Sequence, residues 1–177
     1  MIFVGVDPGK EGAIAGLDQA GDFIQVEPIP LVSSAKGRDE FDLPGIVKIL
    51  APLKTFPGVF VTIEKLHPLP RKMGGSAANF ARGLSRGWEW MLVALSIPYL
   101  LASPQTWQRV MLAGTPGDDT GQRAILAAKR LFPGVDLHRT DRSRKDSDGM
   151  ADALLIAEFG RRVHMGGDVF AAAERGA

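Results

Sequence analysis

Short apolar segments of strand length alternate along this chain with longer segments of helical periodicity. The first three lie at Ile2–Val6, Ala13–Leu17 and Phe23–Glu27, and the turn sequences between them predict a three-stranded meander. Two further strands are predicted at Val59–Ile63 and Pro98–Ala102. Strands that alternate with helices in this way are typical of an α/β sandwich with a mixed central sheet.

The predicted helices carry recognisable start signals. Asp42 can cap a helix that has Pro44 just inside it, and Ser103 with Pro104 can open another. The polar residues 28–40 predict a loop. The apolar side of the helix after Asp42 is expected to consist of Ile46, Val47, Ile49, Leu50 and Leu53. The other helices are expected at about 77–96, 103–112, 120–131 and 148–162, with a basic, irregular segment at 133–147.

Length and composition indicate an ordinary globular protein. The chain has 177 residues, 45% hydrophobic and 23% charged, which suits one domain at 1–165 with a flexible tail at 166–177. No apolar run reaches the roughly 18 residues of a membrane span, and the opening MIFVGVDPGK lacks the features of a signal peptide. The absence of cysteine excludes disulfides, thiolate zinc sites and cysteine nucleophiles. We expect a cytoplasmic protein of a bacterium or phage-infected host rather than of an organelle.

The net charge of +1 hides an uneven distribution of cations. The segment from 71 to 86 has four cations and no acid, namely Arg71, Lys72, Arg82 and Arg86. The segment from 138 to 145 has Arg139, Arg142, Arg144 and Lys145 against Asp141. Such clusters can bind nucleic acid, but ordinary solvated faces have the same composition, so charge alone leaves both interpretations open.

Two carboxylates directly follow apolar strands. Asp7 comes after Ile2–Val6, at the edge of the sheet where α/β proteins commonly bind ligands, although Asp-Pro-Gly is also a common turn. Glu64 ends the most strand-like segment of the chain, and a carboxylate there is costly unless a cation or hydrogen-bond donors compensate it. If the two strands are neighbours, Asp7 and Glu64 lie side by side, and a divalent metal between them would relieve their repulsion.

A further pair of acids stands at the start of the last predicted helix. Asp148 and Asp152 are four residues apart, which places them roughly 40° apart on one helix face. Asp148 could be a simple N-cap, but Asp152 lies too deep in the helix for that role. Carboxylates from separate elements, without a His or Cys ligand pair, suit Mg²⁺ or Mn²⁺ rather than zinc. Two such ions can catalyse phosphodiester hydrolysis, and nothing in the sequence indicates a Ser-His-Asp site.

Three motifs together resemble those of the RuvC-type resolvases. They are GVDPGKEGAIA at the start, VTIEK on the fourth strand and KDSDGMADALLIAEFGRR on the last helix. The sequence is especially similar to the chloroplast resolvases of that group, which pair a DPxxxGAIA start with a KDxGxAxALLIA-like final helix. The resemblance covers about residues 1–162. It implies an RNase H-like fold with a mixed five-stranded sheet flanked by helices, and a homodimer that makes paired nicks in four-way DNA junctions using magnesium.

The resemblance also assigns roles to residues. Asp7, Glu64 and Asp152 match the metal-binding carboxylates, and Asp148 matches the fourth position. Bacterial RuvC spaces its last two functional positions three apart, whereas here the spacing is four, as in the chloroplast type; Asp146 is therefore an alternative fourth ligand. Lys145 matches a lysine of the chloroplast pattern and is expected either to contact a phosphate or to stabilise the scissile phosphate.

The helix at 77–96 resembles the dimer helix of the family. Trp88, Trp90 and Met91 exceed what one helix face needs, which favours a dimer, although core packing explains Trp88 equally well. Phe80 could stack on a base at the junction centre or simply belong to the core. The residues expected to bind DNA are Arg71, Lys72, Phe80, Arg82, Arg86, Arg142, Arg144 and Lys145. No membrane or nucleotide cofactor is expected as a partner.

Other functions stay open at this point. The actin-like ATPases and sugar kinases also open with an aspartate-glycine hairpin, but they need two such domains and typically twice this length. A closer alternative is an RNase H-like nuclease that acts on other branched DNA or on RNA–DNA hybrid. A non-catalytic junction-binding dimer is the third alternative, and the presence of all the expected carboxylates argues against it.

Overall fold

The computed structural model of the chain describes residues 1–35, 37, 39–66 and 75–166, and for residues 75–83 and 85 it describes the backbone alone. The predicted tail at 166–177 therefore lies, apart from Gly166, outside the described residues. None of the described helices is long and apolar enough to cross a membrane.

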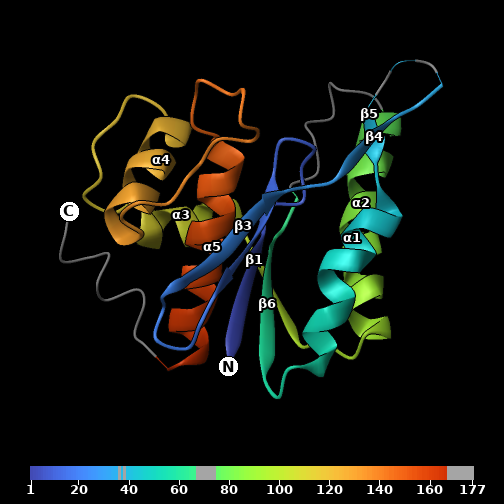
Figure 1. Cartoon of the computed structure of the whole chain (residues 1–177), viewed down its shortest axis with the longest axis horizontal. Coiled ribbons are helices and arrows are strands. Elements are labelled where there is room, and N and C mark those ends of the chain that lie inside the picture. Colours follow the sequence, from blue (N-terminus) through green and yellow to red (C-terminus); the bar gives the residue numbers. More distant parts are fainter. Residues whose placement is uncertain (36, 38, 67–74, 167–177) are drawn as a thin grey trace.

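A five-stranded mixed sheet forms the centre of the molecule (Figure 1). Its spatial order is β3 (Phe23–Pro28), β2 (Ala13–Leu17), β1 (Ile2–Val6), β6 (Val59–Glu64) and β7 (Tyr99–Ala102). Strands β1, β2 and β3 pair antiparallel, which confirms the predicted meander, whereas β6 pairs parallel with both β1 and β7. The predicted mixed five-stranded sheet is thus confirmed.

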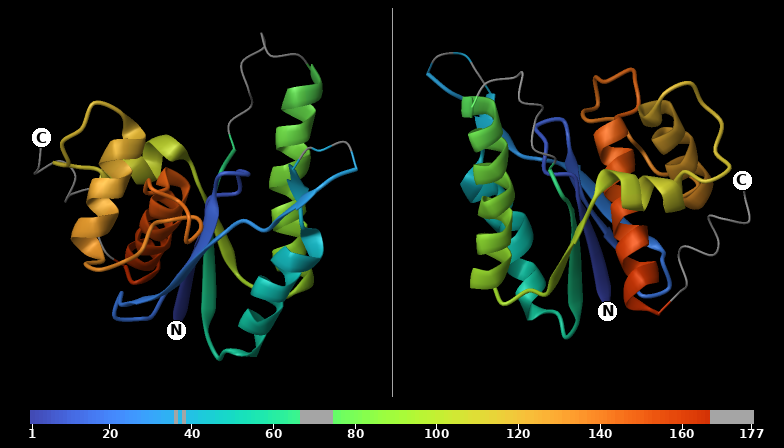
Figure 2. Two further views of the ribbon diagram at one scale, coloured as in Figure 1. Left: turned by 45° about the horizontal axis from the view of Figure 1, so that its top comes forward. Right: turned by 180° about the vertical axis from the view of Figure 1, so that it is seen from behind.

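Helices cover both faces of this sheet (Figure 2). One face carries α3 (Pro104–Met111), α4 (Thr120–Leu131) and α5 (Asp148–His164), and the other carries α1 (Leu43–Leu50) and α2 (Gly75–Ala94). Each face has its own apolar core. The core under α5 includes Trp107, whereas the core under α1 and α2 includes Trp88.

Side-chain caps fix where the helices begin. Asp42 accepts a hydrogen bond from the Gly45 N–H at the start of α1, and Ser103 accepts one from the Thr106 N–H at the start of α3, as predicted. Helix α2 ends at Ala94, before the predicted Ser96, because Ser96 adopts a left-handed conformation with φ 57°.

Two predictions near α1 were wrong. Residues 28–40 are not only a loop, since Leu31–Ser33 (β4) and Asp39–Phe41 (β5) pair as a short antiparallel hairpin. Val47 does not belong to the apolar side of α1, because it is 43% exposed while Ile46 and Leu50 are buried. The turn of about 100° from Ile46 to Val47 carries Val47 away from the sheet. After Leu50 the chain tightens into a 3₁₀ helix, η1, at Ala51–Thr55.

Helix α5 lies directly against the central strands because glycines remove the side chains between them. A Cβ atom on Gly5 of β1 would lie 2.1 Å from the carbonyl oxygen of Ala153, and one on Gly160 would lie 1.8 Å from Thr62 Oγ1 of β6. Helix α5 runs antiparallel to β1 and β6 (Figure 1). The first turn of α5 therefore lies beside the carboxyl ends of those two strands.

Candidate active site

Asp7 and Glu64 are neighbours at the carboxyl edge of the sheet. Strands β1 and β6 are parallel with Val6 opposite Ile63, so the next residue of each strand is a carboxylate. Both side chains are half-buried. The structure thus brings together two acids that are far apart in the sequence, as the strand pattern predicts.

Helix α5 brings two more carboxylates to the same edge. Asp152 is half-buried, and its Oδ1 atom is buried without a hydrogen-bond partner among the described residues. Asp148 is exposed at the first turn, where its Oδ1 accepts the Gly149 N–H at 2.9 Å. The N-cap of α5 is Ser147, which accepts from the Met150 N–H, so Asp148 is not the simple N-cap that was the alternative interpretation.

The four carboxylates act on one another electrostatically. Burial, together with the charge of Asp7, raises the pKa of Glu64 to about 7. Burial and the charges of Asp7, Glu64 and Asp148 raise the pKa of Asp152 to about 8. Burial also raises the pKa of Asp7, and the charge of Asp148 adds to this effect. Such mutual shifts require that the groups share one site.

The donor set suits a hard divalent cation. Every candidate ligand is a carboxylate oxygen, and the unpartnered Asp152 oxygen leaves one buried acceptor available. A cation would also relieve the repulsion that raises these pKa values. Among the residues that the structure describes, no three acidic or histidine side chains already converge on a single metal position.

Trp107 is a residue of this site that sequence reasoning missed. Its side chain is fully buried on α3 and lies close enough to Glu64 to influence the pKa of that carboxyl group. Burial raises the pKa of Glu64, whereas the indole N–H of Trp107 lowers it. This N–H forms no hydrogen bond of normal geometry among the described residues. A tryptophan in an amphipathic helix is typical of a core, so the sequence offered no signal for this role.

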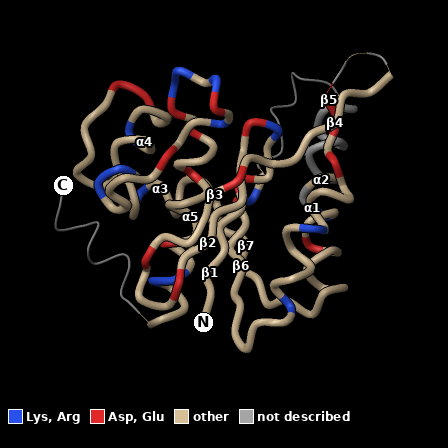
Figure 3. Tube along the Cα trace, viewed as in Figure 1, with Lys and Arg blue, Asp and Glu red and all other residues tan. Residues whose placement is uncertain are grey.

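A hollow of about 490 Å³ lies at the start of α5, and Asp148 is the one member of the four carboxylates that lines it. Lys145, Arg144 and Asp148 line it together, and Arg142 is exposed on the same loop. Figure 3 shows basic and acidic residues close together in this part of the chain. Two of the predicted DNA-binding cations, Arg144 and Lys145, thus share a hollow with Asp148, and all three cations of this loop are exposed.

Comparison with known proteins identifies the fold. No family model and no curated protein matches the sequence. Among solved structures, T. thermophilus RuvC in complex with Holliday junction substrate superposes with a TM-score of 0.60 at 16% identity, covering 94% of this chain and 96% of that one. The chain has the RuvC fold. A second structure of Thermus thermophilus RuvC has a TM-score of 0.52 at 14% identity and covers 94% of this chain and 97% of its own.

Within this RuvC fold, the structure separates the two candidates for the fourth acid. Asp146 lines the same hollow as Asp148, but its carboxylate forms an ion pair of 2.6 Å with Lys129 of α4. Asp148, in contrast, influences the pKa values of both Asp7 and Asp152. The arrangement favours Asp148 over Asp146 as the fourth member of the site.

The remaining predicted DNA contacts belong to α2 and the segment before it. Arg86 is exposed and pairs with Glu89 at 3.3 Å, and Glu89 also accepts the Tyr99 hydroxyl. Arg71 and Lys72 lie outside the described residues, and so do the side chains of Phe80 and Arg82. Of these predicted contacts, the structure therefore describes the side chain of Arg86 alone.

Proposed function

We propose that this chain is a divalent-metal-dependent endonuclease that resolves Holliday junctions by paired, symmetric nicks. One observation carries the proposal: carboxylates from β1, β6 and α5 meet at one edge of a RuvC-fold sheet and raise one another's pKa. A similar structure is that of a RuvC bound to Holliday junction substrate, which supports the choice of substrate.

Asp7, Glu64 and Asp152, with Asp148 as the fourth ligand, would hold Mg²⁺, or Mn²⁺ in its place, as two ions per site. When bound, the metal would activate water for attack on the phosphodiester and stabilise the leaving oxygen. The carboxylates would have to be ionised to bind it, so their protons leave as the site loads. The half-buried position of Asp7, Glu64 and Asp152 limits competition from bulk water.

Two groups of basic residues would hold the DNA backbone. Arg142, Arg144 and Lys145 are exposed on the loop before α5, and Arg144 and Lys145 line the same hollow as Asp148. We assign Lys145 to the scissile phosphate because an exposed lysine can follow a charge that shifts during the reaction. We also assign to the DNA the predicted contacts of α2 and of the segment before it, Arg71, Lys72, Phe80, Arg82 and Arg86.

Helix α2 would form the homodimer contact. Trp90 is 73% exposed and Val93 is 63% exposed, and they lie three residues apart on one helix face. Trp88, in contrast, is buried in the core, so the exposed face is distinct from the packing face. A twofold dimer would present one active site to each of two opposed strands of a four-way junction.

The test compares substrates and two variants. An immobile four-way junction, a matched duplex, a splayed fork and an RNA–DNA hybrid are incubated with the protein, with and without Mg²⁺. Asp152→Asn removes a proposed ligand, and Asp146→Asn is the control because Asp146 pairs with Lys129. We expect symmetric nicks in the junction only, lost with EDTA and reduced by at least about 100-fold in Asp152→Asn.

Each other result points to a different function. Tight junction binding without cleavage in Mg²⁺ or Mn²⁺ would indicate a structure-selective binding protein. Equal cleavage of the fork or the hybrid would leave the metal chemistry in place and remove junction selectivity. Loss of activity in Asp146→Asn but not in Asp152→Asn would mean that the site has been assigned to the wrong acids.

A further inference from the structure

The loop after β1 wraps around the side chain of Asp7. The Gly9 N–H donates to Asp7 Oδ1 at 3.2 Å, and the Gly12 N–H donates to the Gly9 carbonyl at 3.0 Å. A Cβ atom on Gly12 would lie 2.1 Å from the Asp7 carbonyl oxygen, so the loop closes tightly on the residue it follows. Any displacement of this loop would therefore move the Asp7 carboxylate.

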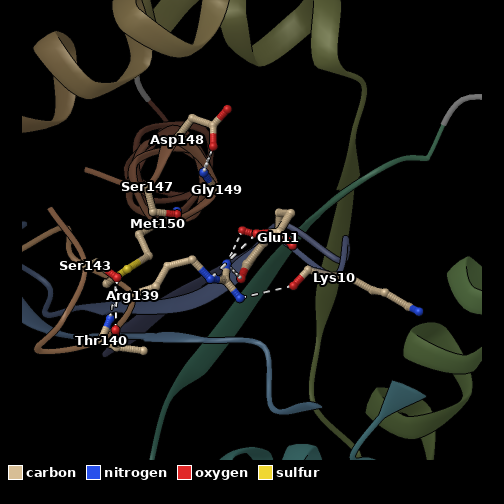
Figure 4. Close-up of polar contacts among 10 residues, drawn as sticks. Lys10, Glu11, Arg139, Thr140, Ser143, Ser147, Asp148, Gly149 and Met150 are labelled. Carbon is tan, nitrogen blue, oxygen red and sulfur yellow. Dashed lines mark hydrogen bonds and ion pairs between the residues drawn. The ribbon is translucent and has the colours of Figure 1, made fainter. Parts of the chain in front are cut away.

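Arg139 holds three successive carbonyl groups of this loop. Its Nη2 atom donates to the Lys10 carbonyl at 3.1 Å, and its Nη1 atom donates to the carbonyls of Glu11 and Gly12, the latter at 3.3 Å. Its Nε atom lies 3.8 Å from a carboxylate oxygen of Glu11. Figure 4 shows the guanidinium reaching across to Lys10 and Glu11. A planar guanidinium can make several such bonds from one rigid group.

The other side of the same loop touches the start of α5. A Cβ atom on Gly149 would lie 2.1 Å from the Glu11 carbonyl oxygen and 2.9 Å from the Gly12 Cα, so only glycine fits there. The segment that carries Arg139 is itself tied to α5. The buried Leu137 accepts the N–H of Ser147, the N-cap of α5, at 2.8 Å. The loop is thus held between Arg139 and the helix that carries Asp148 and Asp152.

We infer that Arg139 is a positioning residue, whose guanidinium fixes the Asp7 loop against α5 and so sets the distance between the Asp7 carboxylate and the acids of α5. The consequence of this positioning for metal binding rests on the proposed function. Arg139 is not a catalytic residue here, since it bonds to backbone carbonyls rather than to the proposed ligands. Its charge also lowers the pKa of Asp7 against the larger effect of burial. A lysine could supply that charge, but it could not span three carbonyl groups.

The test uses Arg139→Ala and Arg139→Lys with Arg161→Ala as the matched control. Arg161 lies near the opposite end of α5, where it donates to the Gln19 carbonyl at 3.3 Å and pairs with Glu158. It therefore also ties a loop to the same helix, but far from the carboxylates. A merely structural role of Arg139 would make all three variants less stable without any difference between them in metal affinity.

Two measurements decide the inference. Mn²⁺ affinity is measured by electron paramagnetic resonance without DNA, and amide hydrogen exchange of residues 9–12 is measured in EDTA. We expect Arg139→Ala and Arg139→Lys each to weaken Mn²⁺ binding by about 10-fold and to speed exchange of the Gly9 and Gly12 amides by a similar factor. Arg161→Ala is expected to keep the parent values of both.

Full restoration of Mn²⁺ affinity in Arg139→Lys would overturn the inference, because charge alone would then suffice. Parent-like affinity and exchange in Arg139→Ala would overturn it as well. If the parent protein binds no Mn²⁺, the proposed nuclease function fails. The exchange rates then decide the role of Arg139 by themselves, and unchanged exchange in Arg139→Ala would refute it.

Discussion

At the scale of single residues, strand ends carried the strongest sequence signal. Asp7 and Glu64 could be predicted as a pair because each directly follows an apolar strand, and Asp152 because it lies too deep in its helix to be a cap. Trp107 and Arg139 could not. Arg139 meets Glu11 across 128 residues of sequence, and no local pattern encodes a contact of that separation. Trp107 looks like any other core tryptophan.

The half-buried acids predict a pH-dependent stability. The ordinary pKa of an aspartate such as Asp152 is 3.8, and in the folded protein it rises to about 8 because of burial and the neighbouring acids. The folded state therefore holds this proton more tightly, and the resulting stabilisation is lost as pH rises towards the folded pKa. We expect the free energy of urea unfolding in EDTA to fall between about pH 5 and about pH 8.5.

Asp152→Asn is the matching variant, since it removes the charge but keeps the shape of the side chain. In this variant we expect the free energy of unfolding to fall less with pH, and to be higher than in the parent protein at about pH 8.5. Burial alone would raise the pKa of Glu158, but hydrogen bonds from Arg161 and Arg162 lower it below the ordinary value of 4.5. The stabilisation from ionised Glu158 is therefore fully present above that value, and it stays constant over the pH interval of this test. A parent stability that rises over the same interval would contradict the prediction.

At the scale of elements, capping and periodicity located the helices, whereas close backbone packing was not visible in the sequence. Asp42 and Ser103 cap as expected because their bonds are local. The hairpin of β4 and β5 escaped prediction because three-residue strands are too short to show alternation. The role of Gly5 also needed the structure, since a glycine in a strand does not reveal which helix lies against it.

Gly5→Ala tests this packing of α5 on β1. The added methyl group would lie 2.1 Å from the Ala153 carbonyl oxygen, so α5 and β1 must move apart. We expect a loss of about 3 kcal/mol in the free energy of unfolding. Gly87→Ala on α2 is the control, because a Cβ there meets nothing within 4 Å and alanine favours helix. Equal stability of the two variants in urea unfolding would show that the contact has been misjudged.

At the scale of the whole molecule, the sequence predicted a mixed sheet but not its order. The parallel pairing of β6 with β1 brings the carboxylates together, and it depends on a connection of more than fifty residues between them. The match to a RuvC structure covers 94% of the chain. The exposed face of α2 stands apart from this core, and Trp88 and Trp90 show the two sides of that helix.

The exposed face of α2 gives a prediction about assembly. Trp90→Glu places a charge at the centre of the proposed dimer contact, so we expect a monomer in sedimentation equilibrium and loss of paired nicking. Stability of the single chain should change little, because Trp90 is 73% exposed. Leu126→Glu on α4, at a position 48% exposed, is the control and should stay dimeric. A dimer that persists in Trp90→Glu would place the contact elsewhere.

The central claim is that the acids of β1, β6 and α5 form one metal site, and anomalous diffraction from crystals soaked in Mn²⁺ tests it most directly. The account predicts anomalous peaks at coordination distance, about 2.0–2.2 Å, from carboxylate oxygens of Asp7, Glu64 and Asp152, with Asp148 beside them. Soaked crystals of Asp152→Asn should lose at least one peak. Strong Mn²⁺ peaks elsewhere in the molecule, with none among these carboxylates, would contradict the account.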